Sequence, residues 1–193
     1  MTWATVALAN LQDVSTVEIQ TDGSVLPTNF QIDGQNVDNY AQLRRAMRTK
    51  AGWVLNLPFD ATGTTPSTRS LNNSALISSV LLFTTYTPSQ GGTCDAGSSR
   101  LYAVNYLTGT AFNFASLGEG TATISGTDYD VFMKFTDLGP GLASTPVVHR
   151  GKGNAGRKVS VFTQSSTGAI PRTMVTLPGG TGGRRSWAEL PFE

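Results

Sequence analysis

The sequence has 193 residues, the size of one domain or slightly more, which is enough to bury a sizeable core. Its 14 Lys and Arg residues nearly balance its 13 Asp and Glu residues, for a formal net charge of +1. This balance gives no electrostatic reason for binding nucleic acid, an acidic polymer or an anionic membrane. The 21 glycines and only 14% charged residues are typical of many short strands joined by tight turns.

The apolar stretches are too short to cross a bilayer in a helix, which takes about 20 residues. They cover residues 76–85, 101–106 and 159–162. We therefore expect no membrane insertion. The first ten residues contain no basic residue ahead of an apolar stretch, so they do not form a secretory signal. If the protein works outside the cell, we expect the chain to be cut from a longer precursor or to be the mature part of one.

The first 51 residues are predicted to form an N-terminal segment with a hairpin and one short helix. Residues 14–20 alternate weakly between apolar and polar side chains, and the sequence TDGS at 21–24 supplies a turn. A first hairpin is therefore expected here.

Residues 39–50 are the one good helix candidate. Apolar side chains recur there at helical spacing, at Tyr40, Leu43 and Met47. Asn39 can cap the first turn, and Gly52 follows the end. Basic residues crowd its last two turns, at Arg44, Arg45, Arg48 and Lys50. Their favourable interaction with the helix macrodipole explains them structurally, and a phosphate- or lipid-binding role is the alternative.

From residue 52 to 193 the pattern predicts a C-terminal region of strands and turns. A short strand at 53–57 ends at Pro58, and a long loop follows at 60–73. Residues 76–85 are apolar almost throughout and rich in β-branched residues, which predicts a single strand in the middle of a sheet. Further strands are expected at 101–105, 144–149, 158–163, 173–177 and 185–190.

Residues 128–135 show the cleanest alternation in the chain and predict one continuous strand. One face would be buried and would carry Tyr129, Val131, Met133 and Phe135. The other would be mostly wet and would carry Asp128, Asp130, Phe132 and Lys134. Strands at this spacing without intervening helices predict an all-β fold of antiparallel strands, as a sandwich, a barrel or propeller blades.

Four segments resemble consecutive landmarks near the C-terminus of the PilC/PilY family of type IV pilus biogenesis and tip adhesin proteins. They are GWVLNLP at 52–58, FTTYTP at 83–88, SSRLYAVNYLTG at 98–109 and RRSWAEL at 184–190, and their order and spacing also match. The resemblance implies a modified β-propeller carried outside the Gram-negative cell. It also implies a role in pilus extension and retraction and in adhesion.

The third segment also has a physical interpretation, as the end of a strand and a tight turn of the kind found in quinoprotein-like propeller blades. Asn105 and Thr108 can hydrogen-bond to backbone groups of the turn, and Gly109 can take a positive φ without steric cost. The motif indicates fold and not chemistry.

Two departures limit what the resemblance implies. Some members of the family have an Asp-rich calcium loop, whereas Asp128 and Asp130 alternate in a strand pattern that points them to solvent, so we predict no metal site and no cofactor. Blades take roughly 40–45 residues each and a ring needs at least four. The chain is therefore expected to form partial β-propeller blades, about three of them.

Enzymatic activity is not expected. A nucleophile with a base would have to pair Cys94 or a serine with His149, the only histidine, and nothing marks either residue as activated. Cys94 is the only cysteine and lies in a Gly-rich loop. It is predicted to be a free surface thiol or one half of an intermolecular disulfide.

Four basic residues flank a predicted hairpin turn: Arg150, Lys152, Arg157 and Lys158. A solvated loop accounts for them, and the alternative is contact with an acidic partner such as a minor pilin. The three tryptophans, Trp3, Trp53 and Trp187, are expected to pack in the core.

The resemblance to PilC/PilY proteins implies a non-catalytic component of a type IV pilus tip or pilus-assembly complex, outside the cell or at its surface. Its expected partners are minor pilins, other pilus-tip proteins or the rest of its own propeller. One alternative is a fragment of a quinoprotein-like dehydrogenase, which would need several metal-binding carboxylates. Another is a carbohydrate-binding β-module, which would need an exposed row of aromatic side chains, for which the candidates are Tyr106, Phe112, Phe114 and Tyr129.

Overall fold

The computed structural model describes residues 6–59, 66–90, 95–150 and 157–179. Within these ranges the chain forms fifteen strands, one α-helix and a short 3-10 helix, η1 (Leu8–Asn10). The all-β class and the single helix near the N-terminus are therefore confirmed. No helix in the described ranges is long and apolar enough to cross a membrane.

The predicted N-terminal hairpin is confirmed. Strands β2 (Glu18–Ile19) and β3 (Val25–Leu26) pair antiparallel, and Gly23 in the turn between them has φ +89°. A second short antiparallel pair follows, formed by β4 (Gln31–Ile32) and β5 (Gln35–Asn36).

The predicted helix is also confirmed, as α1 (Tyr40–Met47). The Asn39 side chain caps it by accepting a hydrogen bond from the backbone N–H of Gln42, at 3.0 Å. The helix ends three residues earlier than expected. The three apolar residues at helical spacing are buried and turn this face of the helix toward the core.

One pair of strands is parallel, which the prediction of antiparallel strands did not include. Strand β1 (Gln12–Asp13) pairs with β6 (Trp53–Val54) in parallel register. Strand β6 is also shorter than the predicted strand at 53–57. The pairing brings the two ends of the N-terminal segment together.

The largest sheet has four antiparallel strands in the order β12-β9-β8-β7. Its strands are β7 (Ala75–Ile77), β8 (Val80–Thr87), β9 (Ser98–Asn105) and β12 (Phe135–Pro140). The prediction of one strand at 76–85 was wrong, because the chain turns back at Ser78 and Ser79, both with positive φ. Strand β8 does lie inside the sheet, as predicted, and its neighbour β9 is mostly buried.

The prediction of one strand at 128–135 was also wrong. Strand β11 (Thr127–Phe132) pairs with β10 (Glu119–Ile124), and the chain then crosses at residues 133–134 to begin β12. The crossing interrupts the alternation. Phe132 and Lys134, which were expected on the wet face, are therefore both buried.

The last sheet has three antiparallel strands: β13 (Val147–His149), β14 (Lys158–Phe162) and β15 (Arg172–Thr176). They confirm the strands predicted at 144–149, 158–163 and 173–177, with small shifts at the ends. The strand predicted at 185–190 lies outside the described residues.

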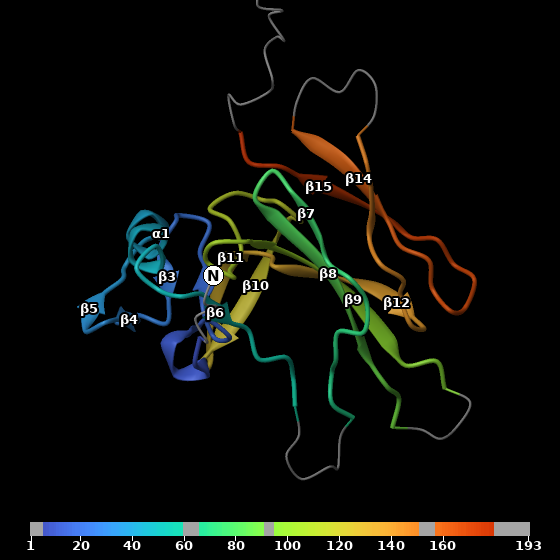
Figure 1. The fold of residues 1–193 in the computed structure, drawn as a ribbon, viewed down its shortest axis with the longest axis horizontal. Coiled ribbons are helices and arrows are strands. Elements are labelled where there is room, and N and C mark those ends of the chain that lie inside the picture. The colour runs from blue at the N-terminus through green and yellow to red at the C-terminus, as the bar shows by residue number, and fades with distance from the viewer. Residues whose placement is uncertain (1–5, 60–65, 91–94, 151–156, 180–193) are drawn as a thin grey trace, which may run out of the picture.

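Two hydrophobic cores hold these elements together. The first combines buried residues of the N-terminal segment, such as Leu43, with Ala111 and Phe132 from later in the chain. Residues on both sides of the expected boundary after residue 51 thus pack together, and the division into two regions stays a prediction. The second core lies between the four-stranded and three-stranded sheets, where Leu82 and Ala103 meet Val161. These two sheets are stacked (Figure 1).

Candidate functional site

The residues predicted to contact partners are only partly described by the structure. Cys94 and Lys152 lie outside the described residues. His149 ends β13 and is exposed, as is Arg150 after it. Because His149 pairs with Ser160, Arg150 and Lys158 lie at the same end of the three-stranded sheet. Their role as a partner contact stays a prediction.

Arg157, the remaining member of this basic cluster, contacts its own chain. Its Nε donates a hydrogen bond to the backbone oxygen of Leu177, at 3.3 Å. Its guanidinium carbon lies 5.6 Å from the centre of the Phe114 ring, a cation–π contact. Arg157 therefore helps to hold β14 against the segment that follows β15.

The turn that follows β9 has the geometry that the sequence predicts. The Asn105 side-chain oxygen accepts a hydrogen bond from the backbone N–H of Leu107, at 2.8 Å, and Gly109 has φ +70°. The backbone N–H of Gly109 donates to the oxygen of Asn105, also at 2.8 Å. The Thr108 hydroxyl is buried and within 2.9 Å of the Thr110 hydroxyl. The turn is thus closed by its own side chains and backbone.

Trp53 packs on this turn from β6. Its indole Nε1 donates a hydrogen bond to the backbone oxygen of Tyr106, at 2.8 Å. A Cβ atom added at Gly109 would lie only 2.4 Å from Cδ2 of the Trp53 ring, so the ring rests directly on the glycine. Trp53 is partly buried against the first core. The packing role expected for the tryptophans holds for Trp53, while Trp3 and Trp187 lie outside the described residues.

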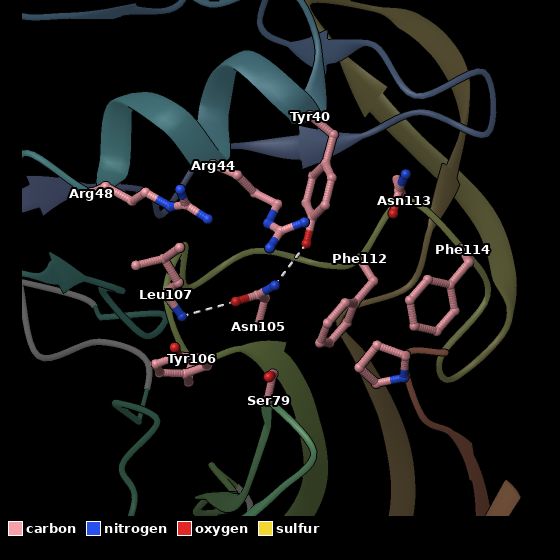
Figure 2. Close-up of a pocket in the computed structure, with 11 residues that line it drawn as sticks. Tyr40, Arg44, Arg48, Ser79, Asn105, Tyr106, Leu107, Phe112, Asn113 and Phe114 are labelled. Carbon is pink, nitrogen blue, oxygen red and sulfur yellow. Dashed lines mark hydrogen bonds between the residues drawn. The ribbon is translucent and has the colours of Figure 1, made fainter. Parts of the chain in front are cut away.

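A cavity of about 330 Å3 lies between this turn and α1 (Figure 2). One wall carries Arg44 and Arg48 from the helix, whose side chains extend toward the turn. The rest is formed mainly by aromatic and polar residues of the turn and of the segment after it. The other lining residues are Tyr40, Ser79, Asn105, Tyr106, Leu107, Phe112, Asn113, Phe114 and Pro178.

Tyr40 connects the helix to the turn at the base of this cavity. Its hydroxyl accepts a hydrogen bond from the side-chain amide of Asn105, at 2.8 Å (Figure 2). Burial raises the pKa of Tyr40, while the hydrogen bond from Asn105 and the positive charge of Arg44 partly oppose that shift. The phenol therefore stays neutral at physiological pH and acts as a polar anchor.

The candidates for a carbohydrate platform are not arranged as a row. Tyr106, Phe112 and Phe114 line the cavity, whereas Tyr129 lies on β11 and does not line it. Phe112 is only 3% exposed, and its ring centre is 5.0 Å from that of Phe114. These rings form a packed wall and not an open stacking surface.

A buried ion pair, which no sequence pattern indicated, joins the crossing segment to the N-terminal hairpin. The Lys134 ammonium lies 2.6 Å from the Glu18 carboxylate and donates to the backbone oxygens of Ser15 and Val17, at 3.3 and 3.4 Å. Only 9% of the Lys134 side chain is exposed. The pair positions the N-terminal segment on the end of β11.

No protein-family model, no curated protein and no solved structure matches this chain. In the part of the chain that the structure describes, no group of three or more His, Cys, Asp and Glu residues is placed to hold a metal ion.

Proposed function

We propose that this chain is a non-catalytic module of a type IV pilus tip or pilus-assembly complex, and that it acts outside the cell through protein–protein contacts. The proposal begins with the four segments that resemble PilC/PilY proteins. The geometry around Asn105 and Gly109 supports the interpretation of the third segment as a blade-ending turn. Minor pilins and other pilus-tip proteins are the proposed partners.

The arrangement of the two larger sheets is compatible with partial propeller blades. Each sheet is antiparallel, and β13, β14 and β15 follow one another in space as they do in the chain. The four-stranded sheet has the same sequential order, except that the β10–β11 hairpin is inserted between β9 and β12. We propose that these sheets are two adjacent blades, packed face to face through the second core.

The observation that carries the proposal is the apolar surface left exposed on the outer face of the three-stranded sheet, beside the Arg172 side chain that covers Ser160. The pairing of Val147 with Phe162, and of Ser160 with Met174, puts these four residues on the face opposite the second core. Val147 is 62% exposed and Met174 is 41% exposed, and Ile170 beside this sheet is 65% exposed. In a propeller this face would be covered by the next blade, supplied by another chain or segment.

The test is binding of the full chain to purified minor pilins, with variants of this outer face. Val147→Asp and Met174→Asp each place a charge on the proposed interface, and together they are expected to weaken binding by at least about tenfold. Leu8→Asp is the control, because Leu8 is 72% exposed but lies on η1, outside both of these sheets. If the wild-type chain does not bind minor pilins, the pilus role is contradicted.

The two alternatives give different results in the same series. A carbohydrate-binding module would bind glycans in an array and would be insensitive to Val147→Asp. A dehydrogenase fragment would gain stability from a quinone cofactor and calcium added together.

A further inference from the structure

We propose that the cavity between α1 and the turn after β9 is a binding site for a carboxylate next to an aromatic side chain, as in an acidic peptide segment of a partner protein. This site is separate from the outer face of the three-stranded sheet, and it does not depend on the pilus proposal. The cavity has a positive charge, because its eleven lining residues include Arg44 and Arg48 but no Asp or Glu.

The two arginines converge on one space without an internal counter-ion. Arg44 lies on α1 and Arg48 is its C-cap residue, four positions later, so the two side chains lie on the same side of the helix end, where like charges repel each other. Among the described residues no carboxylate forms an ion pair with either, whereas Lys50 pairs with Asp33 and Arg100 pairs with Asp137. The helix macrodipole explains why basic residues stand near the end of α1, but not why these two line the same cavity.

The wall opposite the arginines favours a ligand with an apolar group next to its carboxylate. It is made of Phe112, Phe114 and Pro178, and Tyr106, which is 52% exposed, lines another part of the cavity near Leu107. A free phosphate has no apolar part to fill this space. A guanidinium binds a carboxylate with two parallel hydrogen bonds, and an aromatic side chain would pack against the partly exposed Phe114 and Pro178.

The central amide of the cavity is engaged within the chain. Asn105, the central amide, already donates to the Tyr40 hydroxyl and accepts from the N–H of Leu107. The volume of about 330 Å3 is at the lower end of the range for ligand pockets and suits one or two side chains.

The experiment titrates the full chain with the capped dipeptide acetyl-Phe-Glu-amide and follows chemical shifts of backbone amides by NMR. We expect saturable shifts around Leu107 and Asn113, and affinity at least about tenfold lower for acetyl-Phe-Gln-amide, which lacks the charge. Acetyl-Ala-Glu-amide, which lacks the ring, should also bind more weakly. This comparison uses the unaltered chain, and equal affinity for the Glu and Gln peptides would overturn the proposal.

Variants then assign the site. Arg44→Gln with Arg48→Gln should lower the affinity for acetyl-Phe-Glu-amide by at least about tenfold. Arg45→Gln removes one positive charge from the same helix but lies away from the cavity, and should leave the affinity unchanged. An equal loss of peptide affinity in the double variant and in Arg45→Gln would overturn the proposal. So would tighter binding of glucuronate or inorganic phosphate than of the peptide.

Discussion

The indole N–H of Trp53 donates a hydrogen bond to the backbone oxygen of Tyr106, 53 residues later in the chain, while the ring rests on Gly109. Trp53 lies on β6, which pairs with β1 of the N-terminal segment, and the turn that contains Gly109 directly follows β9. This contact therefore ties the N-terminal segment to the four-stranded sheet. The same turn forms one side of the cavity that faces α1.

Gly109→Ala is expected to destabilise the protein more than a positive φ alone would. The alanine would have to adopt the left-handed backbone conformation at φ +70°, and its Cβ would also collide with the Trp53 ring. Gly126→Ala is the control, because Gly126 has φ +81° but no atom within 4 Å of the added Cβ. We expect the free energy of unfolding, measured in urea, to fall by about 1–2 kcal/mol more for Gly109→Ala. Equal losses would mean that the Trp53 contact contributes nothing.

Lys134→Met is expected to lower the free energy of unfolding by about 2–3 kcal/mol, because it leaves the Glu18 carboxylate partly buried without a cation. The exposed fraction of the Glu18 side chain, 20%, keeps this below the cost of a fully buried charge. Adding Glu18→Gln to Lys134→Met should recover part of the loss. A double-mutant cycle in urea measures this coupling, and strictly additive losses would contradict a stabilising pair.

Asn39→Ala removes the side chain that caps α1 and should cost about 1 kcal/mol of unfolding free energy. The reason is that the N–H of Gln42 loses its acceptor at the first turn of the helix. Asn73→Ala changes an exposed asparagine outside any helix or strand and should have little effect. Chemical denaturation of both variants checks the difference, and a neutral Asn39→Ala would show that the cap is dispensable.

Asp13 gives a prediction about acid stability. The Ser15 hydroxyl and the Ser15 backbone N–H, together with the Asn56 amide, lower the pKa of the Asp13 carboxyl. A carboxyl whose pKa is lowered by folding stabilises the protein above its unfolded pKa, and this contribution is lost as the pH falls below about 4. Asp13→Asn should therefore flatten the decline in stability below about pH 4. Parallel pH profiles of thermal unfolding for variant and wild type would refute it.

Local signals explain which elements the sequence predicted. Tyr40, Leu43 and Met47 at helical spacing, with a capping Asn39, specify a helix through contacts within a few residues. The turn at 105–109 is likewise local, since Asn105 and Gly109 form hydrogen bonds within these five residues. In contrast, the turn between β7 and β8 is made by Ser78 and Ser79, which lack the strong preference for positive φ that Asn-Gly would have shown.

The candidate site could not be predicted because its parts come together only in the folded chain. Arg44 and Arg48 are explained locally by the end of the helix, and nothing in the sequence places them opposite Phe112 and Pro178. The partner of Lys134 is equally remote, since Glu18 precedes it by more than a hundred residues. The alternation at 128–135 predicted Lys134 in solvent, because it could not reveal that the chain leaves one strand pair for another at this point.

The central claim is that a partner covers the outer face of the three-stranded sheet, and light scattering of the full chain over a concentration series tests it most directly, alongside a dye that reports exposed apolar surface. We predict concentration-dependent association and dye binding, both reduced by Val147→Asp with Met174→Asp and unchanged by Leu8→Asp. A strictly monomeric, dye-negative protein at high concentration would contradict the claim and would indicate a self-contained β-sandwich.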